Sequence, residues 1–132
     1  MYGPANRATY LRLLFRGNCI STSATCIEAA LLRSVDGFDE ATEIVTAEDY
    51  DLWMRLAATN PKTVFIPEIL GEFHLLSDSA SSAVLRNLAS EKTVLQKHFA
   101  LQPRSSLTKL KIRHRLATAN YGAARQLSHQ PR

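Results

Sequence analysis

Residues 37–57 read GFDEATEIVTAEDYDLWMRLA and hold the clearest helical signal in the chain. We predict a helix over residues 46–59, because its apolar side chains recur at i, i+1, i+4 and i+5. That spacing places them on one stripe that can face a core: Leu52, Trp53, Leu56 and Ala57. Thr46 is suited to be the N-cap residue, and acids in the first turn suit the helix dipole. The Asn60-Pro61 pair ends the predicted helix.

Outward from this helix, the pattern predicts short strands and further helices. Strands are expected where β-branched and aromatic residues gather, over residues 19–27, 63–66 and 69–75. Helices are expected where apolar residues recur at helical spacing, over residues 7–15 and 28–34, in a segment ending near residue 100, and from Ser105 or Ser106 onward. Three short strands make a poor independent sheet. Either they pair with strands that this chain lacks, or the domain is mostly α.

The composition of the 132 residues bounds the class of protein. A hydrophobic content of 45% with few Gly and Pro excludes a disordered or collagen-like chain. The apolar runs are too short for a transmembrane helix, and residues 1–16 lack the apolar region of a secretory signal. Cys19 and Cys26 match no common zinc spacing and are expected to be small buried apolar residues in a reducing compartment.

The charge is distributed unevenly along the chain. Residues 104–132 carry seven Lys and Arg and no acid, whereas residues 1–103 carry nine basic and all twelve acidic residues. A basic tail on an acidic body suggests an anionic neighbour, which could be a membrane surface, a nucleic acid or an acidic protein. We therefore divide the chain into a domain over residues 1–102 and a basic amphipathic helical tail over residues 103–132.

The acids at the start of the predicted helix allow two interpretations. Carboxylates at a helix N-terminus are held ionised by the dipole and the free N–H groups. An ionised Asp that faces a cleft can accept a proton from a hydroxyl group. Alternatively, Thr46 and Asp49 resemble a capping box, and acids in a first turn are common without any catalytic role.

Two motifs resemble the C-terminal half of a glycosyltransferase family 2 catalytic domain. The turn at residues 37–40 resembles the family's GGFDE-like turn, and residues 48–57 resemble its ED-x-DLW-x-RLA stretch. Residues 17–20 are similar to the family's "GN" start, and residues 64–70 to its strand with I-x-E-x-L. The resemblance implies an α/β fold of the GT-A type. The chain would be a helix-rich part of it, with about three short strands and two long C-terminal helices.

The resemblance also implies an activity and roles for individual residues. The enzymes transfer a sugar from a nucleotide-sugar donor to an acceptor hydroxyl with inversion. In this chain Asp49 would be the general base, and Glu48 would shape the acceptor site or hold the base in position. The expected acceptor is a sugar or a lipid-linked molecule in polysaccharide or cell-envelope biosynthesis. The candidates for acceptor or donor contacts are Asp51, Trp53, Arg55 and His74.

Some of those residues also have a purely structural interpretation. Arg55 could pair with Asp51 at i, i+4, or lie near the diphosphate. Trp53 is expected to pack into the core, with sugar stacking as the less favoured alternative.

The sequence departs from the family in two places. The family's Y-R-x-H-x-x-S-x-S segment corresponds to residues 73–81, where His74 replaces the Arg and Leu76 replaces the His. His74 could bind a metal or a phosphate, or be a core residue. The resemblance implies a divalent cation, Mg²⁺ or Mn²⁺, for the full domain. The DxD motif that would hold it follows an apolar strand, and residues 49–51 do not. We therefore expect the chain alone to be inactive.

A second hypothesis is a non-catalytic interaction module whose basic tail binds a membrane surface or a nucleic acid. Nucleic acid is disfavoured, because the tail has one aromatic residue, Tyr121, and no recognised binding motif. Self-association is expected from unpaired strand edges. The expected location is the cytoplasm, where the protein could also bind peripherally to the inner face of the membrane.

Overall fold

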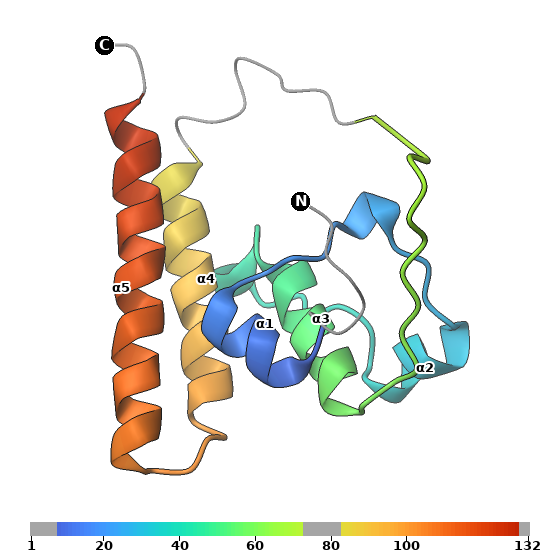
Figure 1. The fold of residues 1–132 in the computed structure, drawn as a ribbon, viewed down its shortest axis with the longest axis horizontal. Coiled ribbons are helices and arrows are strands. Elements are labelled where there is room, and N and C mark those ends of the chain that lie inside the picture. The colour runs from blue at the N-terminus through green and yellow to red at the C-terminus, as the bar shows by residue number, and fades with distance from the viewer. Residues whose placement is uncertain (1–7, 73–82, 130–132) are drawn as a thin grey trace. The chain divides into compact units, whose positions relative to one another are not determined.

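The structure is a computed structural model that describes residues 8–72 and 83–129 (Figure 1). Its α-helices are α1 (Tyr10–Arg16), α2 (Ala29–Ser34), α3 (Glu48–Ala58), α4 (Val84–Phe99) and α5 (Ser106–Ser128). Two single 3₁₀ turns, η2 (Thr22–Ala24) and η3 (Thr42–Ile44), lie between them. Within these described ranges no residue is in a β-strand.

The chain divides into two compact units that alternate along the sequence. Unit 1 comprises Met1–Glu40 and Glu48–Phe73, and unit 2 comprises Ala41–Ala47 and His74–Arg132. Residues 103–132, predicted as a separate tail, therefore belong with α4 to unit 2.

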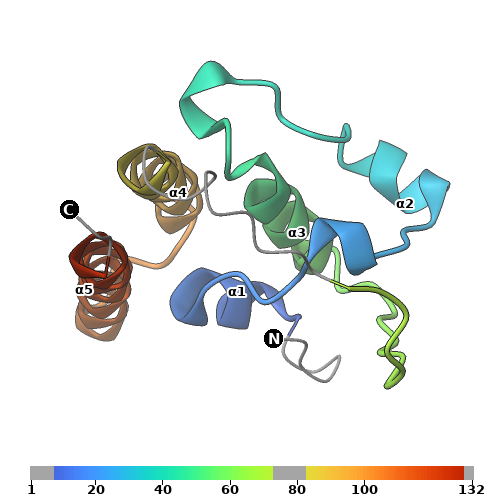
Figure 2. The same ribbon diagram turned by 90° about the horizontal axis from the view of Figure 1, so that it is seen from above.

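The core of unit 1 forms where α1 packs against α3, which lie side by side in Figures 1 and 2. Leu13 and Leu14 of α1 are fully buried, as are Leu52 and Met54 of α3. Tyr50 ties the two helices together, because its hydroxyl donates a 2.5 Å hydrogen bond to the Leu13 carbonyl. The same carbonyl also accepts a 3.0 Å hydrogen bond from the Gly17 amide at the end of α1.

Unit 2 is built on a hairpin of α4 and α5, which pack side by side (Figures 1 and 2). Ser105 caps α5 by accepting a 3.1 Å hydrogen bond from the Thr108 amide, as the sequence predicts. Ala119 and Ala123 are buried along α5, and their small side chains allow close helix packing. Ser90 of α4 donates a 2.7 Å hydrogen bond to the carbonyl of Val45, directly after η3.

A partly buried ion pair also joins the two helices of the hairpin. Arg115 of α5 is 4% exposed and donates a hydrogen bond from Nη2 to Oε1 of Glu91 on α4.

In the part of the chain that the structure describes, no helix has the length and apolar character needed to cross a bilayer.

The α/β fold class predicted from the sequence is wrong, and the mostly helical alternative is correct. Residues 19–27 form a 3₁₀ turn flanked by irregular backbone, and residues 61–72 form no regular element. Residues 73–75 of the third predicted strand lie outside the described residues. β-Propensity reflects how a side chain packs on a sheet more than a backbone preference. A β-branched run without a partner strand therefore has no ladder to join.

The helices were predicted more accurately than the strands. The predicted segments 7–15, 28–34 and 46–59 contain or overlap α1, α2 and α3. The helix predicted to end near residue 100 is α4, which ends at Phe99. Thr46 stands two residues before α3 with a φ of 87°, so it is not the residue next to the first helical position.

Candidate functional site

The candidate site is centred on Asp49 in the first turn of α3. The side chain is half-buried and both of its oxygens are held. Oδ2 accepts a 2.9 Å hydrogen bond from the Thr22 hydroxyl, and Oδ1 lies 2.6 Å from the amide nitrogen of Tyr50. Each carboxylate oxygen can accept more than one hydrogen bond. Asp49 therefore retains acceptor capacity toward solvent.

Thr22 begins the 3₁₀ turn η2, in a segment rich in hydroxyl groups. Its neighbours Ser21 and Ser23 share a 3.1 Å hydrogen bond between their hydroxyls. Thr25 fixes the turn by donating a 2.7 Å hydrogen bond to the Ser21 carbonyl. The turn thus presents exposed hydroxyl groups beside Asp49, a chemistry suited to contacting a polyhydroxylated ligand.

Sequence analysis missed Thr22, because the segment was interpreted as a strand. The Ser/Thr run of residues 21–25 was the available signal, since these residues favour turns in which hydroxyls bond to nearby backbone.

Glu48 precedes Asp49 and is also half-buried. It is the first residue of α3, and the first turn holds the three acids Glu48, Asp49 and Asp51. The structure therefore places the two residues predicted as catalytic next to each other at one helix start.

Asp51 and Arg55 form the i, i+4 pair that the sequence analysis left open. The Asp51 side chain is fully buried, and its Oδ2 lies 2.6 Å from Nε of Arg55. Arg55 also donates from Nη1 to the carbonyl of Val35, at the end of α2. The pair consequently holds α3 to the chain that follows α2, and Asp51 is not presented to solvent.

Trp53 lies in the core, as the packing interpretation predicts, with a relative exposure of 4%. Its Nε1 is buried and has no hydrogen-bond partner within the described residues. A buried indole N–H normally finds an acceptor. The sequence alternative in which Trp53 stacks on a sugar would require an exposed ring face, which this position does not offer.

His74 lies outside the described residues. Its role in donor or metal binding therefore stays a prediction. Across residues 8–72 and 83–129, no three His, Cys, Asp or Glu side chains come together in a group suited to a metal ion. Glu48 and Asp49 provide carboxylates that a cation could use, as hard divalent cations prefer oxygen ligands, but two side chains do not make a complete metal site.

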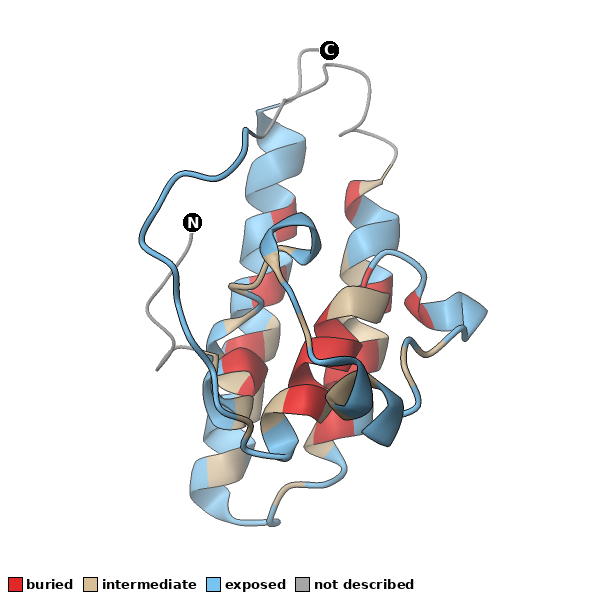
Figure 3. Cartoon of the chain, turned by 90° about the vertical axis from the view of Figure 1, so that its right-hand side faces the viewer, coloured by how far each residue is buried: buried red, intermediate tan, exposed pale blue. Residues whose placement is uncertain are grey.

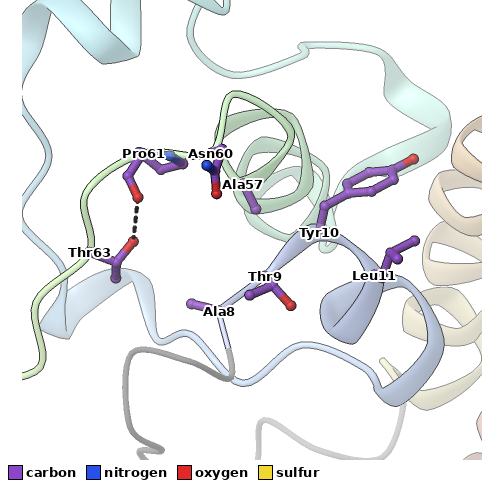
Figure 4. A pocket seen from close by; sticks show the side chains of 8 residues that line it. All are labelled: Ala8, Thr9, Tyr10, Leu11, Ala57, Asn60, Pro61 and Thr63. Carbon is purple, nitrogen blue, oxygen red and sulfur yellow. Dashed lines mark hydrogen bonds between the residues drawn. The ribbon is translucent and has the colours of Figure 1, made fainter.

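A hollow of about 460 Å³ lies elsewhere in unit 1, where the start of α1 meets the end of α3 (Figure 4). Figure 4 shows Tyr10 and Leu11 on one side and Asn60 and Pro61 on the other, with Thr63 donating a 3.4 Å hydrogen bond to the Pro61 carbonyl. Its lining has no charged side chain and none of the predicted site residues. The hollow is therefore not the site at which a charged sugar nucleotide would react.

Comparison with known proteins adds no assignment: no protein-family model matches the chain, and no curated protein or solved structure is significantly similar to it.

Proposed function

We propose that this chain carries the acceptor-side half of an inverting glycosyltransferase, with Asp49 as its general base. The proposal rests on one observation above all. Within the stretch that resembles the family's ED-x-DLW-x-RLA motif, Asp49 is a partly exposed carboxylate whose oxygens are held by the Thr22 hydroxyl and the Tyr50 amide. The buried Asp51 and the paired Arg55 support the helix instead.

The chemistry follows from that geometry. Asp49 accepts the proton of an acceptor hydroxyl while the oxygen attacks the anomeric carbon of the donor sugar. The bond from that carbon to the phosphate oxygen breaks, and its electron pair leaves with the nucleoside diphosphate. A fixed carboxylate contributes to such a step by removing the proton as charge develops. The hydrogen bond from Thr22 orients one oxygen and leaves the carboxylate in place for the incoming hydroxyl.

The leaving diphosphate needs positive charge, which a divalent cation or an Arg/Lys clamp supplies. The described residues near Asp49 hold Glu48 and hydroxyl groups but no assembled metal group. Transfer therefore requires a nucleotide-binding part with a DxD motif, and we expect the chain alone to bind acceptor but not to turn over a sugar nucleotide.

Acceptor binding can be tested on the chain by itself. Nuclear magnetic resonance of the ¹⁵N-labelled protein should show amide shifts at Thr22, Ser23 and Asp49 on titration with methyl glycosides of glucose, galactose, mannose and N-acetylglucosamine. Asp49→Asn should reduce these shifts, and Asp36→Asn should not. Asp36 is an exposed acid of the same unit with a φ of 60°, a conformation that Asn also tolerates. Absence of shifts at the three amides for every glycoside would overturn the acceptor site.

Transfer is tested after joining the chain to a nucleotide-binding half. Acceptor-dependent release of UDP or GDP in the presence of Mn²⁺ should fall at least about a hundredfold in Asp49→Asn, with the folded state unchanged by circular dichroism. Asp36→Asn should retain the parent rate. Equal rates in the two variants would show that Asp49 is not the base.

A further inference from the structure

The α4–α5 hairpin of unit 2 is strongly electropositive. Residues 83–129 contain nine Lys and Arg and a single acid, Glu91. That acid is already engaged by the buried Arg115. This segment contains no second carboxylate, so it carries a large excess of positive charge that favours an anionic surface.

Large apolar side chains are exposed on the same hairpin. Leu107 and Leu110 of α5 are each 62% exposed, and Tyr121 is 70% exposed. At 100° per residue these positions lie on the side of α5 opposite to the buried Arg115, Ala119 and Ala123. Figure 3 shows α5 as mostly exposed, with buried residues recurring at intervals along it. The outward side of α5 thus exposes large apolar side chains on a helix that is rich in Lys and Arg.

The exposed leucines gather toward the turn that joins the two helices. Leu101 in this turn is 72% exposed, and Arg104 between α4 and α5 is also exposed. In the first half of α5, the exposed cations Lys109 and Arg113 lie along one edge of the side that carries the leucines. We call Leu101, Arg104, Leu107, Lys109, Leu110 and Arg113 the basic–leucine end of the hairpin.

We propose that the basic–leucine end binds the surface of an anionic lipid bilayer. The cations would lie at the level of the phosphate headgroups, where each Lys or Arg strengthens binding. The leucines would enter the boundary between headgroups and acyl chains, where apolar side chains of interfacial helices are buried. This inference holds whether or not the chain transfers sugars.

Other partners fit the surface less well. A second copy that docked through the same end would add a second set of cations to the contact, and like charges at a contact are destabilising. A nucleic acid would match the cations through its phosphates but would leave the exposed Leu107 and Leu110 without a partner. A groove-binding helix needs large apolar anchors at successive turns, whereas His114 and Ala117 separate Leu110 from Tyr121 on the outward side of α5.

Co-sedimentation of the full chain with vesicles tests the proposal. The chain should bind vesicles of phosphatidylcholine containing a third phosphatidylserine, and should not bind phosphatidylcholine alone. Lys109→Glu with Arg113→Glu should weaken binding at least about 25-fold, from roughly fivefold per basic residue. Leu107→Ser with Leu110→Ser should weaken it about tenfold. Arg12→Glu with Lys62→Glu makes the same charge change at exposed positions of unit 1 and should leave binding unchanged.

Circular dichroism and thermal melting establish that each variant is folded. Equal binding to both vesicle types, or unaltered binding by the Lys109/Arg113 variant, would overturn the proposal. If the Leu107/Leu110 variant bound the vesicles as tightly as the parent, the claim that these leucines enter the bilayer would be overturned. Tighter binding to a duplex DNA than to the anionic vesicles at the same salt would assign the surface to nucleic acid instead.

Discussion

The hydroxyl of Thr22 lies 2.9 Å from Oδ2 of Asp49, although 27 residues separate them in the chain. The hydrogen bond joins the single turn η2 to the start of α3 and fixes one face of the carboxylate. Because Thr22 is exposed, this bond contributes little to the stability of the fold. Its main effect is on the orientation of Asp49.

Thr22→Val should separate orientation from stability. Val keeps the shape of the side chain but cannot donate, so transfer by the joined enzyme should fall about tenfold while the free energy of unfolding changes by about 1 kcal/mol or less. Thr22→Ser keeps the hydroxyl and should restore most of the rate. Steady-state kinetics and urea unfolding measure the two quantities. A Val variant with the parent rate would contradict a positioning role for Thr22.

Asp51→Asn should destabilise unit 1 by about 3 kcal/mol, because it leaves the Arg55 guanidinium without its buried carboxylate. Asp49→Asn provides the matched comparison two residues away. There the side chain is half-buried and Asn still offers a carbonyl oxygen to Thr22, so the loss should be about 1 kcal/mol or less. Urea unfolding followed by circular dichroism compares them. Similar losses for both variants would show that Asp51 is not the buried anchor.

Two Gly→Ala substitutions should change stability in opposite directions. Gly37 has a φ of 66° and no atom within 4 Å of an added Cβ, so Gly37→Ala should cost about 1 kcal/mol through backbone conformation alone. Gly122 lies inside α5 with equally open surroundings. Gly122→Ala should stabilise the protein by about 1 kcal/mol through helix propensity. Thermal melts of both variants check the signs: stabilisation by Gly37→Ala would contradict the cost of a left-handed turn, and destabilisation by Gly122→Ala would contradict the helix-propensity gain.

The apolar segment around Ile69 should govern self-association. Ile69 is 96% exposed, and Val64 and Leu70 are also mostly exposed in backbone without regular structure. Exposed β-prone segments are templates for pairing with other chains. Ile69→Lys should lower the apparent mass in concentrated solution, measured by sedimentation velocity, and leave the unfolding free energy within about 0.5 kcal/mol of the parent. Glu68→Lys, one position earlier, serves as the charge control. An unchanged mass in Ile69→Lys would exclude this segment as the contact.

The helices could be predicted from the sequence because the signals for each are local. The stripe formed by Leu52, Trp53 and Leu56 is set by the 3.6-residue period and faces the core in the structure. The capping hydroxyl of Ser105 also acts within one turn. Such features depend on neighbours in the chain and not on the rest of the fold.

The strands could not be predicted in the same way, because a strand exists only with a partner. Val64, Phe65 and Ile66 have the composition of a strand, yet they are exposed in the described structure. Their side chains would pack well on a sheet, but a sheet also requires partner strands formed by other residues. Composition therefore overestimated the β content of this chain.

The candidate site was predictable in part. The position of Asp49 at a helix start follows from residues 46–59 alone, and the Asp51–Arg55 pair follows from the i, i+4 spacing. The contact from Thr22 depends on how η2 packs against α3, and no local sequence pattern predicts that packing. The same is true of the hydrogen bond from Tyr50 to the Leu13 carbonyl.

The alternation of the two units along the chain bears on how the protein can be dissected. Residues Ala41–Ala47 belong to unit 2, although the chain on both sides of them belongs to unit 1. A truncation after Phe73 would strip this loop of its natural neighbours, and expressing the hairpin alone would remove the Val45 carbonyl that Ser90 uses. Neither half can be isolated intact by a single cut, so deletion mapping should use internal replacement of residues 41–47 by a neutral linker.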